Sequence, residues 1–426
     1  MDPSISLSSD LAMHILQRVG EAGQPPEQGI SHLNVGNESY LGILEKEYLN
    51  RLKHNPRGSS FKLVQGYYGG GKTHFLYCVR DLAWRHGFPT ALVNLSPREC
   101  PYDDPVKVYS AVASCLSGPP VERGAEPTRS LPDLLRDVID DHLASSGEER
   151  TLTWIRRSAS RIAVESHSFR KAAAEFMSAY LEGRRDEEAV LEPWLLGEPV
   201  PLAETRPLGI YEAMEPSTGF KMLRSLTQVI SGIGLPGVVL LFDEVDRNMS
   251  LTAKKMHAVG DNLRQVVDLC GQARLPATLF LYAVPPEFLR NVVPEYPALD
   301  QRLKSPVSLS VRSPQAAVID LEYLDMEPAT LLAGIGGKLL DIFKVAFAWE
   351  ADPSVQKHNL TMVSGTMASY TFEVSHRRLF VKSYVDFLHG QRSDGQRRIT
   401  EEDAASLARG SYAALSSLDE EEFLDA

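Results

Sequence analysis

The sequence predicts an α/β protein with a parallel five-stranded sheet flanked by helices, a helical insertion and a C-terminal helical lid. Three observations lead to this expectation. The glycine-rich stretch "GYYGGGKTHF" directly follows the short apolar run "FKLV". A second apolar run, "VVLLF", ends in two adjacent carboxylates. Beyond Pro314 the apolar residues recur at helical spacing and no further strand is indicated.

We expect three regions along the chain. Residues 1–55 form an N-terminal helical segment, residues 56–314 form the sheet-containing core, and residues 315–426 form the lid and a tail. Within the core, the residues from about 118 to 231 are too many for one connection between strands, so this insertion must contain helices of its own.

The bulk composition narrows the class of protein. A hydrophobic fraction of 43% and a charged fraction of 23% are ordinary for a globular protein. A formal net charge of −12 argues against a protein that coats nucleic acid through bulk charge, although it is compatible with one local basic surface. No apolar stretch reaches the roughly 18 residues that span a bilayer, and the N-terminus lacks a signal-peptide pattern, so we expect a cytoplasmic protein with no membrane partner.

The first element of the core is the strand "FKLVQG" with the loop that follows it. Gly66, Gly71, Lys72 and Thr73 fit the spacing G-x-x-x-x-G-K-[ST], in which successive backbone N–H groups encircle a phosphate. The lysine then meets the β- and γ-phosphate oxygens, and the threonine hydroxyl holds Mg²⁺. A plain flexible turn is the alternative. The strand before the loop and the helix after it favour a site for ATP and Mg²⁺.

The helix after the loop, "KTHFLYCVRDLAWRHG", is expected to end at Gly87 and to aim its N-terminus at the phosphates. His74 lies in its first turn, where we expect a packing or supporting role rather than a catalytic one. The residues expected to bind the nucleotide are Gly66, Gly69, Gly70, Gly71, Lys72, Thr73, His74 and Arg377.

The next two strands are "TALVNLS" and the apolar part of "GVVLLFDEVDR". The later one delivers Asp243 and Glu244 at its carboxyl end, where a sheet of this class binds its ligands. Asp243 is expected in the Mg²⁺ shell, and Glu244 is expected to orient and deprotonate the attacking water. An acidic strand edge without such a role is the alternative. The immediate Asp-Glu pair favours ATP hydrolases of the additional-strand class over nucleotide kinases and Ras-like GTPases.

The fourth strand, "ATLFLYAVPPEFL", departs from the pattern of many such ATPases. They end this strand with Asn, Ser or Thr, which holds the lytic water on the side opposite the glutamate. Here the strand leaves through Tyr282, Ala283, Val284 and two prolines. The polar sensor is therefore missing or substituted, which argues against fast hydrolysis.

Three further arginines are candidates for contacts to the nucleotide. Arg302 lies near the end of an expected helix, just before an expected fifth strand, "VSLSV". It either reaches the γ-phosphate bound by a neighbouring subunit, which requires a homo-oligomer, or forms a salt bridge within its own chain. Arg377 and Arg378 begin a helix of the lid, and they either reach the bound nucleotide or lie on a solvated helix start.

The densest basic surface of the sequence lies in the insertion, around "TLTWIRRSASRIAVES". Apolar residues such as Ile155 fall on one helical face, whereas Trp154, Arg157 and Arg161 fall on the other. Such a face could contact the phosphates of DNA or RNA and stack on a base. A solvated helix balanced by nearby acidic residues is the alternative.

Four stretches together, "FKLVQGYYGGGKTHFL", "VNLSPRECPYDDPVKVY", "VVLLFDEVDR" and "PALDQRL", resemble the ATP-binding P-loop family (BrxC/BrxD-like) of bacteriophage-exclusion (BREX) defence systems. More broadly they resemble the AAA+ branch that contains replication-origin ATPases. The likeness covers most of residues 30–390 and implies an ATPase that acts with other defence proteins, and on DNA, to restrict phage propagation. It supports the phosphate, metal and hydrolysis roles of Lys72, Thr73, Asp243 and Glu244, and more weakly those of Arg302 and Arg377.

We therefore expect an AAA+-type P-loop ATPase that binds ATP and ADP, forms a homo-oligomer and drives assembly on, or remodelling of, DNA or a defence complex. Its expected catalytic residues are Glu244, Lys72 and Arg302. The altered fourth strand favours a second hypothesis, a nucleotide-gated scaffold with little turnover, whereas the intact Asp243 and Glu244 favour the first. An origin-type DNA-loading ATPase is the third hypothesis.

Overall fold

A computed structural model of the chain describes residues 7–55, 58–96, 100, 102–119, 129–243, 253–272, 274–303, 307–370 and 376–410. The chain forms two compact units. The first contains Met1–Leu41, Gln65–Asp81 and Asp320–Ala426, and the second contains Gly42–Val64 and Leu82–Ile319.

The second unit is an α/β unit. Its strands are β1 (Ser59–Gln65), β2 (Thr90–Asn94), β3 (Leu116–Ser117), β4 (Val238–Asp243), β5 (Thr278–Val284) and β6 (Val318–Asp320), of which the last residues of β1 and β6 belong to the first unit. Its helices are α3 (Asn50–His54), α5 (Pro105–Cys115), α6 (Leu131–Ser146), α7 (Glu148–Arg157), α8 (His167–Glu182), α9 (Arg185–Leu195), α10 (Leu202–Thr205), α11 (Gly219–Gly232), α12 (Ala253–Gly271) and α13 (Pro297–Leu303). Two helices, α2 (Glu38–Ile43) and α4 (Lys72–Arg85), run from the first unit into the second.

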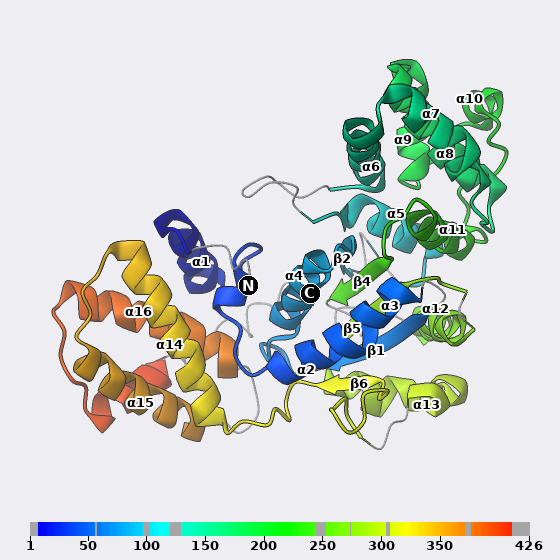
Figure 1. Ribbon diagram of the computed structural model, residues 1–426. Helices are drawn as coiled ribbons and strands as arrows, with labels where there is room; N and C mark the ends of the chain where they lie inside the picture. Colours follow the sequence, from blue (N-terminus) through cyan, green and yellow to red (C-terminus); the bar gives the residue numbers. More distant parts are fainter. Residues whose placement is uncertain are drawn as a thin grey trace. The chain divides into compact units, whose positions relative to one another are not determined.

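The six strands form one sheet in the order β3-β2-β4-β5-β1-β6, and Figure 1 labels the five strands from β2 to β6 in this order. Strand β4 pairs in parallel with β2 and with β5, and Asn94 at the end of β2 stands opposite Asp243 at the end of β4. Every residue of β4 and β5 is buried. Burial on both faces of the sheet explains why these strands are continuous apolar runs in the sequence.

The expected α/β class with a mainly parallel sheet and surrounding helices is confirmed, with a sixth strand in addition. The short strand β3 pairs antiparallel with β2, where Thr90 stands opposite Ser117 and Ala91 opposite Leu116. Strand β3 has only two residues and follows α5 directly, so the sequence contains no apolar run of strand length that would predict it.

The expected position of the fifth strand is wrong. Residues 307–311, "VSLSV", contain a turn in which Ser310 pairs with Ser313, and the strand is β6, seven residues beyond Val311 at its start. Burial explains the difference: Val311 is 77% exposed, whereas Ile319 is fully buried. The alternation of valine and serine gives strand propensity, but the more apolar segment that follows is the one that the core can bury.

The insertion between β3 and β4 is helical, from α6 to α11. Ser130 caps α6 by accepting a hydrogen bond from the Asp133 N–H at 3.2 Å, and Ser166 caps α8 through the Phe169 N–H at 3.0 Å. Trp194 on α9 and Phe169 on α8 are buried in the same hydrophobic cluster as the sheet. The insertion therefore has a core that is continuous with that of the α/β unit.

Helices dominate the described part of the first unit. They are α1 (Ser9–Ala22), α14 (Pro328–Phe347), α15 (Pro353–Tyr370), α16 (His376–Ser393) and a last helical run over residues 401–410. Helix α1 packs on α14 and α16, and their apolar faces share one hydrophobic cluster that includes Leu339 and Phe380 (Figure 1). No helix in the described ranges carries an apolar stretch long enough to cross a membrane.

Candidate functional site

The glycine-rich loop lies between the end of β1 and the start of α4, in the first unit. Gly69 and Gly71 have φ angles of 69° and 90°, in the left-handed region that other residues seldom adopt. At Gly70 a Cβ atom would stand 2.6 Å from Glu322 Oε1 and 3.0 Å from the Tyr67 carbonyl oxygen. Gly69 and Gly71 are thus needed for their backbone conformation, and Gly70 is needed because a side chain there would have no room.

Lys72 is the first residue of α4, and it is only 7% exposed. Its ammonium group donates hydrogen bonds to the carbonyl oxygens of Gly66 at 3.0 Å and Tyr67 at 3.1 Å. These bonds hold the cation against the start of the loop, while the Phe75 N–H donates to the Gly71 carbonyl at 2.9 Å and begins the helix. The N–H groups of a first helical turn have no partner inside the helix, so the loop, the lysine and the helix start fit an anion such as a polyphosphate.

Thr73 and His74 follow Lys72 in the first turn of α4. Burial and, to a smaller extent, the nearby guanidinium of Arg377 together lower the pKa of His74 to about 4. The imidazole is therefore neutral at neutral pH. It can support the loop by packing or as a neutral hydrogen-bonding group, but it adds no positive charge for a phosphate.

Arg377 lies at the start of α16 and contacts the loop within the first unit. Its Nη1 donates to the Gly70 carbonyl at 2.5 Å, and its Nη2 donates to the Leu321 carbonyl at 2.5 Å. Burial lowers the pKa of Arg377, and the carboxylate of Glu322 opposes that shift. The structure thus brings this arginine to the loop backbone, and contact with a bound nucleotide stays a prediction.

The neighbouring Arg378 contacts the loop at a second point. Its Nη1 donates to the Tyr68 hydroxyl at 2.6 Å, and its guanidinium lies 5.4 Å from the centre of the Tyr68 ring. Tyr68 is 46% exposed, so this contact is closer to solvent than that of Arg377.

Sequence reasoning missed Glu322, which follows β6 directly. Its Oε1 accepts a hydrogen bond from the Tyr67 N–H at 2.8 Å. One signal was available: the segment "VIDLE" places two carboxylates, Asp320 and Glu322, at the end of an apolar run.

Asp243 lies in the second unit, at the carboxyl end of β4, and it is 2% exposed. Its carbonyl oxygen accepts from the Leu95 N–H at 3.0 Å, just beyond the end of β2. Carboxylate and hydroxyl oxygens are the ligands that Mg²⁺ takes from proteins at nucleotide sites, so Asp243 and Thr73 are of the right chemical type to hold it. Across the described ranges, no group of three or more His, Cys, Asp or Glu side chains could hold a metal ion.

Two of the expected catalytic residues cannot be placed. Glu244 lies outside the described residues. Arg302 belongs to α13, but its side chain lies outside the described part of the structure. Their roles in catalysis stay predictions.

The end of β5 is apolar and aromatic, as the sequence indicated. Tyr282 is fully buried, and its hydroxyl is hydrogen bonded to that of Tyr102. Its ring stacks on Phe242 of β4, with the ring centres 4.6 Å apart. Burial raises the pKa of Tyr282 well above its usual value, so the hydroxyl stays protonated. This part of the sheet supplies packing rather than a polar group at its surface.

The basic stretch of the insertion forms α7 and the short turn after it. Arg150, Arg157 and Arg161 are exposed, and among the described residues their side chains make no hydrogen bond or ion pair. Trp154 stacks on His142 with ring centres 3.9 Å apart, and Ile155 is buried in the core. One face of the tryptophan is thus already covered, which leaves the arginines as the available part of this surface.

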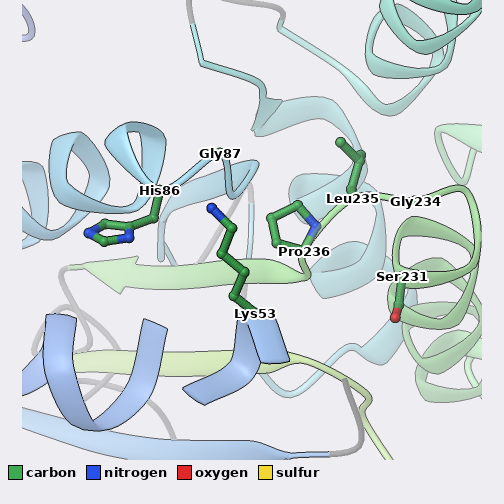
Figure 2. A pocket seen from close by; sticks show the side chains of 7 residues that line it. All are labelled: Lys53, His86, Gly87, Ser231, Gly234, Leu235 and Pro236. Atoms are coloured by element: carbon green, nitrogen blue, oxygen red, sulfur yellow. The ribbon is translucent and has the colours of Figure 1, made fainter. Parts of the chain in front are cut away.

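A pocket of about 420 Å³ lies in the second unit, near the amino ends of β2 and β4. Lys53, His86, Gly87, Ser231, Gly234, Leu235 and Pro236 line it. Figure 2 shows the Lys53 side chain pointing between His86 and Pro236. His86 Nε2 lies 2.9 Å from Glu45 Oε1, so its polar group already has a partner. The pocket is at the end of β4 opposite to Asp243.

Comparisons with known proteins give one solved structure and one family model. The Aeropyrum pernix ORC2 protein, solved as ADPNP–ADP complexes, is 12% identical, with a TM-score of 0.42 over 89% of this chain and 68% of that chain. No curated protein matches the chain. The family model described as "BREX system ATP-binding protein BrxC/D" matches residues 8–402, a range that contains the glycine-rich loop and the whole sheet. By that match, this chain belongs to the BrxC/D family of BREX system ATP-binding proteins.

Proposed function

We propose that this chain binds ATP with Mg²⁺ at residues 66–73 and hydrolyses it to drive assembly on, or remodelling of, DNA or a defence complex. One observation carries the proposal: the Lys72 ammonium bridges the carbonyls of Gly66 and Tyr67 at the start of α4. With Gly69 and Gly71 in left-handed conformations, the loop has the shape and the charge for a polyphosphate.

Each group then has a separable task. The loop N–H groups and Lys72 bind the phosphates, and Thr73 and Asp243 hold Mg²⁺, which neutralises charge on the phosphate oxygens. Glu244 orients the attacking water and accepts its proton. The strand order supports an ATP hydrolase of the additional-strand class, because β5 stands between β1, which leads into the loop, and β4, which carries Asp243.

The end of β5 favours a second candidate, a nucleotide-gated scaffold with little turnover. In such a protein ATP binding changes the contacts that the helices make with partners, and hydrolysis is slow. Buried Tyr282 occupies the region where a polar sensor would hold the lytic water, and its hydroxyl is already bonded to Tyr102. A positioned water contributes to the rate only if groups on both sides hold it in line.

DNA contact is proposed at the exposed arginines of α7 and of the short turn after it. Arg150, Arg157 and Arg161 present three charges to solvent, and a DNA backbone would gain from releasing counterions there. Phosphate contacts of this kind bind without reading sequence. We also propose that the chain works in the cytoplasm as a homo-oligomer with other defence proteins, and that Arg302 acts on the nucleotide of a neighbouring subunit.

Phosphate release from the purified full chain separates the two candidates. We expect release from the wild type to rise with duplex DNA and to fall to background in Glu244→Gln. Equal, near-background rates for both proteins would contradict hydrolysis and leave the scaffold.

ATP binding itself is tested by calorimetry with Lys72→Ala. We expect this variant to bind ATP at least about 100-fold more weakly, because it loses the one cation held inside the loop. Unchanged binding would contradict the assigned site. Light scattering with ATP and Mg²⁺ tests the oligomer, which a subunit-bridging Arg302 requires.

A further inference from the structure

The carboxylate of Glu322 is fixed against the phosphate loop by a short network. Its own N–H donates to Asp320 Oδ1 at 3.0 Å, and Asp320 Oδ2 accepts from Gln65 Nε2 at 3.1 Å. The Leu321 N–H donates to the Gln65 carbonyl at 2.9 Å. The segment that carries Glu322 is therefore anchored to the last residue before the loop.

From this anchored position, Glu322 and Arg377 hold the loop at two backbone groups. Glu322 Oε1 accepts from the Tyr67 N–H at 2.8 Å, and Arg377 Nη1 donates to the Gly70 carbonyl at 2.5 Å. The Gly70 N–H donates to the Tyr67 carbonyl at 3.0 Å. Tyr67 and Gly70 thus form one turn, which is held at its donor end by a carboxylate and at its acceptor end by a guanidinium.

The glycine at position 70 and the carboxylate at position 322 fit each other closely. A Cβ atom at Gly70 would lie 2.6 Å from Glu322 Oε1, closer than two such atoms can approach. The carboxylate therefore occupies the space that a side chain at position 70 would take. A side chain at position 70 would therefore displace the carboxylate from the Tyr67 N–H.

We propose that Glu322 is a positioning residue for nucleotide binding, whose carboxylate fixes the turn between Tyr67 and Gly70 before the phosphates arrive. The inference rests on the proposed function of the loop as a polyphosphate site. A loop already in its binding shape loses less freedom when a ligand binds, so its affinity is higher. The charge of the carboxylate acts in the opposite direction, because an anion near the loop repels phosphate. Variants that separate the hydrogen bond from the charge therefore decide the question.

The experiment measures ATP and AMP dissociation constants for the purified full chain in Mg²⁺ buffer. Glu322→Gln keeps an acceptor oxygen and removes the charge, whereas Glu322→Ala removes both. We expect Glu322→Ala to bind ATP about tenfold more weakly, the size of one lost hydrogen bond to a charged group. We expect Glu322→Gln to stay within about threefold of the wild type, and AMP, which lacks the β- and γ-phosphates, to change much less than ATP.

Glu327→Ala is the matched control, because Glu327 is an exposed carboxylate nearby in the sequence and its side chain makes no capping bond to α14. It should bind ATP like the wild type. Thermal melting checks that each variant is folded, and Glu322→Asp, which is one methylene too short to reach Tyr67, replaces Glu322→Ala if that variant fails to fold. It should bind ATP as weakly as expected for the alanine variant.

Several results would overturn the proposal. Tighter ATP binding by both Glu322→Ala and Glu322→Gln would make the carboxylate a competing anion instead. Unchanged ATP binding by Glu322→Ala, or an equal loss for ATP and AMP, would remove the positioning role while leaving the ATP site intact. If the wild type failed to bind ATP, that result would contradict the proposed function, and it would contradict this inference as well.

Discussion

The arginines in two regions of this molecule differ in whether their guanidinium groups are hydrogen bonded to the protein. At the start of α16, Arg377 donates both ends of its guanidinium to backbone carbonyls, those of Gly70 and Leu321. In the insertion, Arg157 and Arg161 are exposed, and in the described part of the chain their side chains bond to nothing. In the sequence both regions read alike, as adjacent or closely spaced arginines at a helix end.

The difference teaches what each charge is available for. A guanidinium whose donors are used by the chain's own carbonyls positions those carbonyls, and a ligand has to compete for it. An exposed guanidinium without a partner retains its donors for a ligand, at the entropic cost of ordering a long side chain. We therefore assign a structural contribution to Arg377 and a binding contribution to the surface of α7.

The largest expected effect is the loss of stability when Arg377, whose donors bind backbone carbonyls, is replaced. Arg377→Met should lower the free energy of unfolding by about 3 kcal/mol, because two carbonyls lose charged donors. Arg378→Met is the control: its bond to the Tyr68 hydroxyl lies closer to solvent, so we expect a loss of less than about 1 kcal/mol. Urea denaturation of both variants measures the two values. Equal losses would show that Arg377 contributes no more to the free energy of unfolding than Arg378 does.

A second prediction concerns the exposed arginines. Replacing Arg150, Arg157 and Arg161 together by Gln should weaken binding to duplex DNA at least about tenfold at physiological salt. The slope of the logarithm of the binding constant against the logarithm of the salt concentration should fall in magnitude by about 2 to 3. The stability of the protein should not change.

Its control removes the same charge from elsewhere in the chain. Lys338, Lys357 and Arg409 are exposed and make no side-chain ion pair within the described ranges, so their replacement by Gln should leave DNA affinity near that of the wild type. Fluorescence anisotropy with a labelled duplex measures both variants. If the two triple variants lose the same affinity, only net charge matters, and α7 is not the DNA-binding surface.

The smallest effect concerns a third basic group, His74, which lies near Arg377. Its pKa in the folded protein is about 4 against an ordinary value of 6.5, so below pH 6.5 the unfolded chain takes up a proton that the folded chain does not. Stability should therefore fall as the pH falls from 6.5 towards 4, with a contribution of at most about 1.4 kcal/mol per pH unit. His74→Gln should remove this contribution, which denaturation between pH 7 and pH 5 measures. An unchanged pH dependence would mean that the imidazole is protonated in the folded state.

Local patterns in the sequence predicted much of the fold and part of the site. The strand, the loop and the helix over residues 59–85 follow from apolar spacing and glycine positions, and β4 and β5 follow from continuous apolar runs. These features depend on neighbours in the sequence. The same is true of Lys72, whose place at the start of α4 is fixed by the motif itself.

The features that sequence reasoning missed depend on residues far apart in the chain. Glu322 meets Tyr67 across 255 positions, so no local spacing predicts that contact. Arg377 was expected to bind the nucleotide, but its bond to the Gly70 carbonyl spans 307 positions and was not predicted. The strand β6 was misplaced because its burial, rather than its propensity, distinguishes it from "VSLSV".

The close fit between Gly70 and Glu322 ties a hydrogen bond to the absence of a side chain. A methyl group at position 70 would push the carboxylate away from the Tyr67 N–H that it binds. A smaller residue at position 322 would relieve only part of this crowding, because the Tyr67 carbonyl oxygen would still lie 3.0 Å from the added atom.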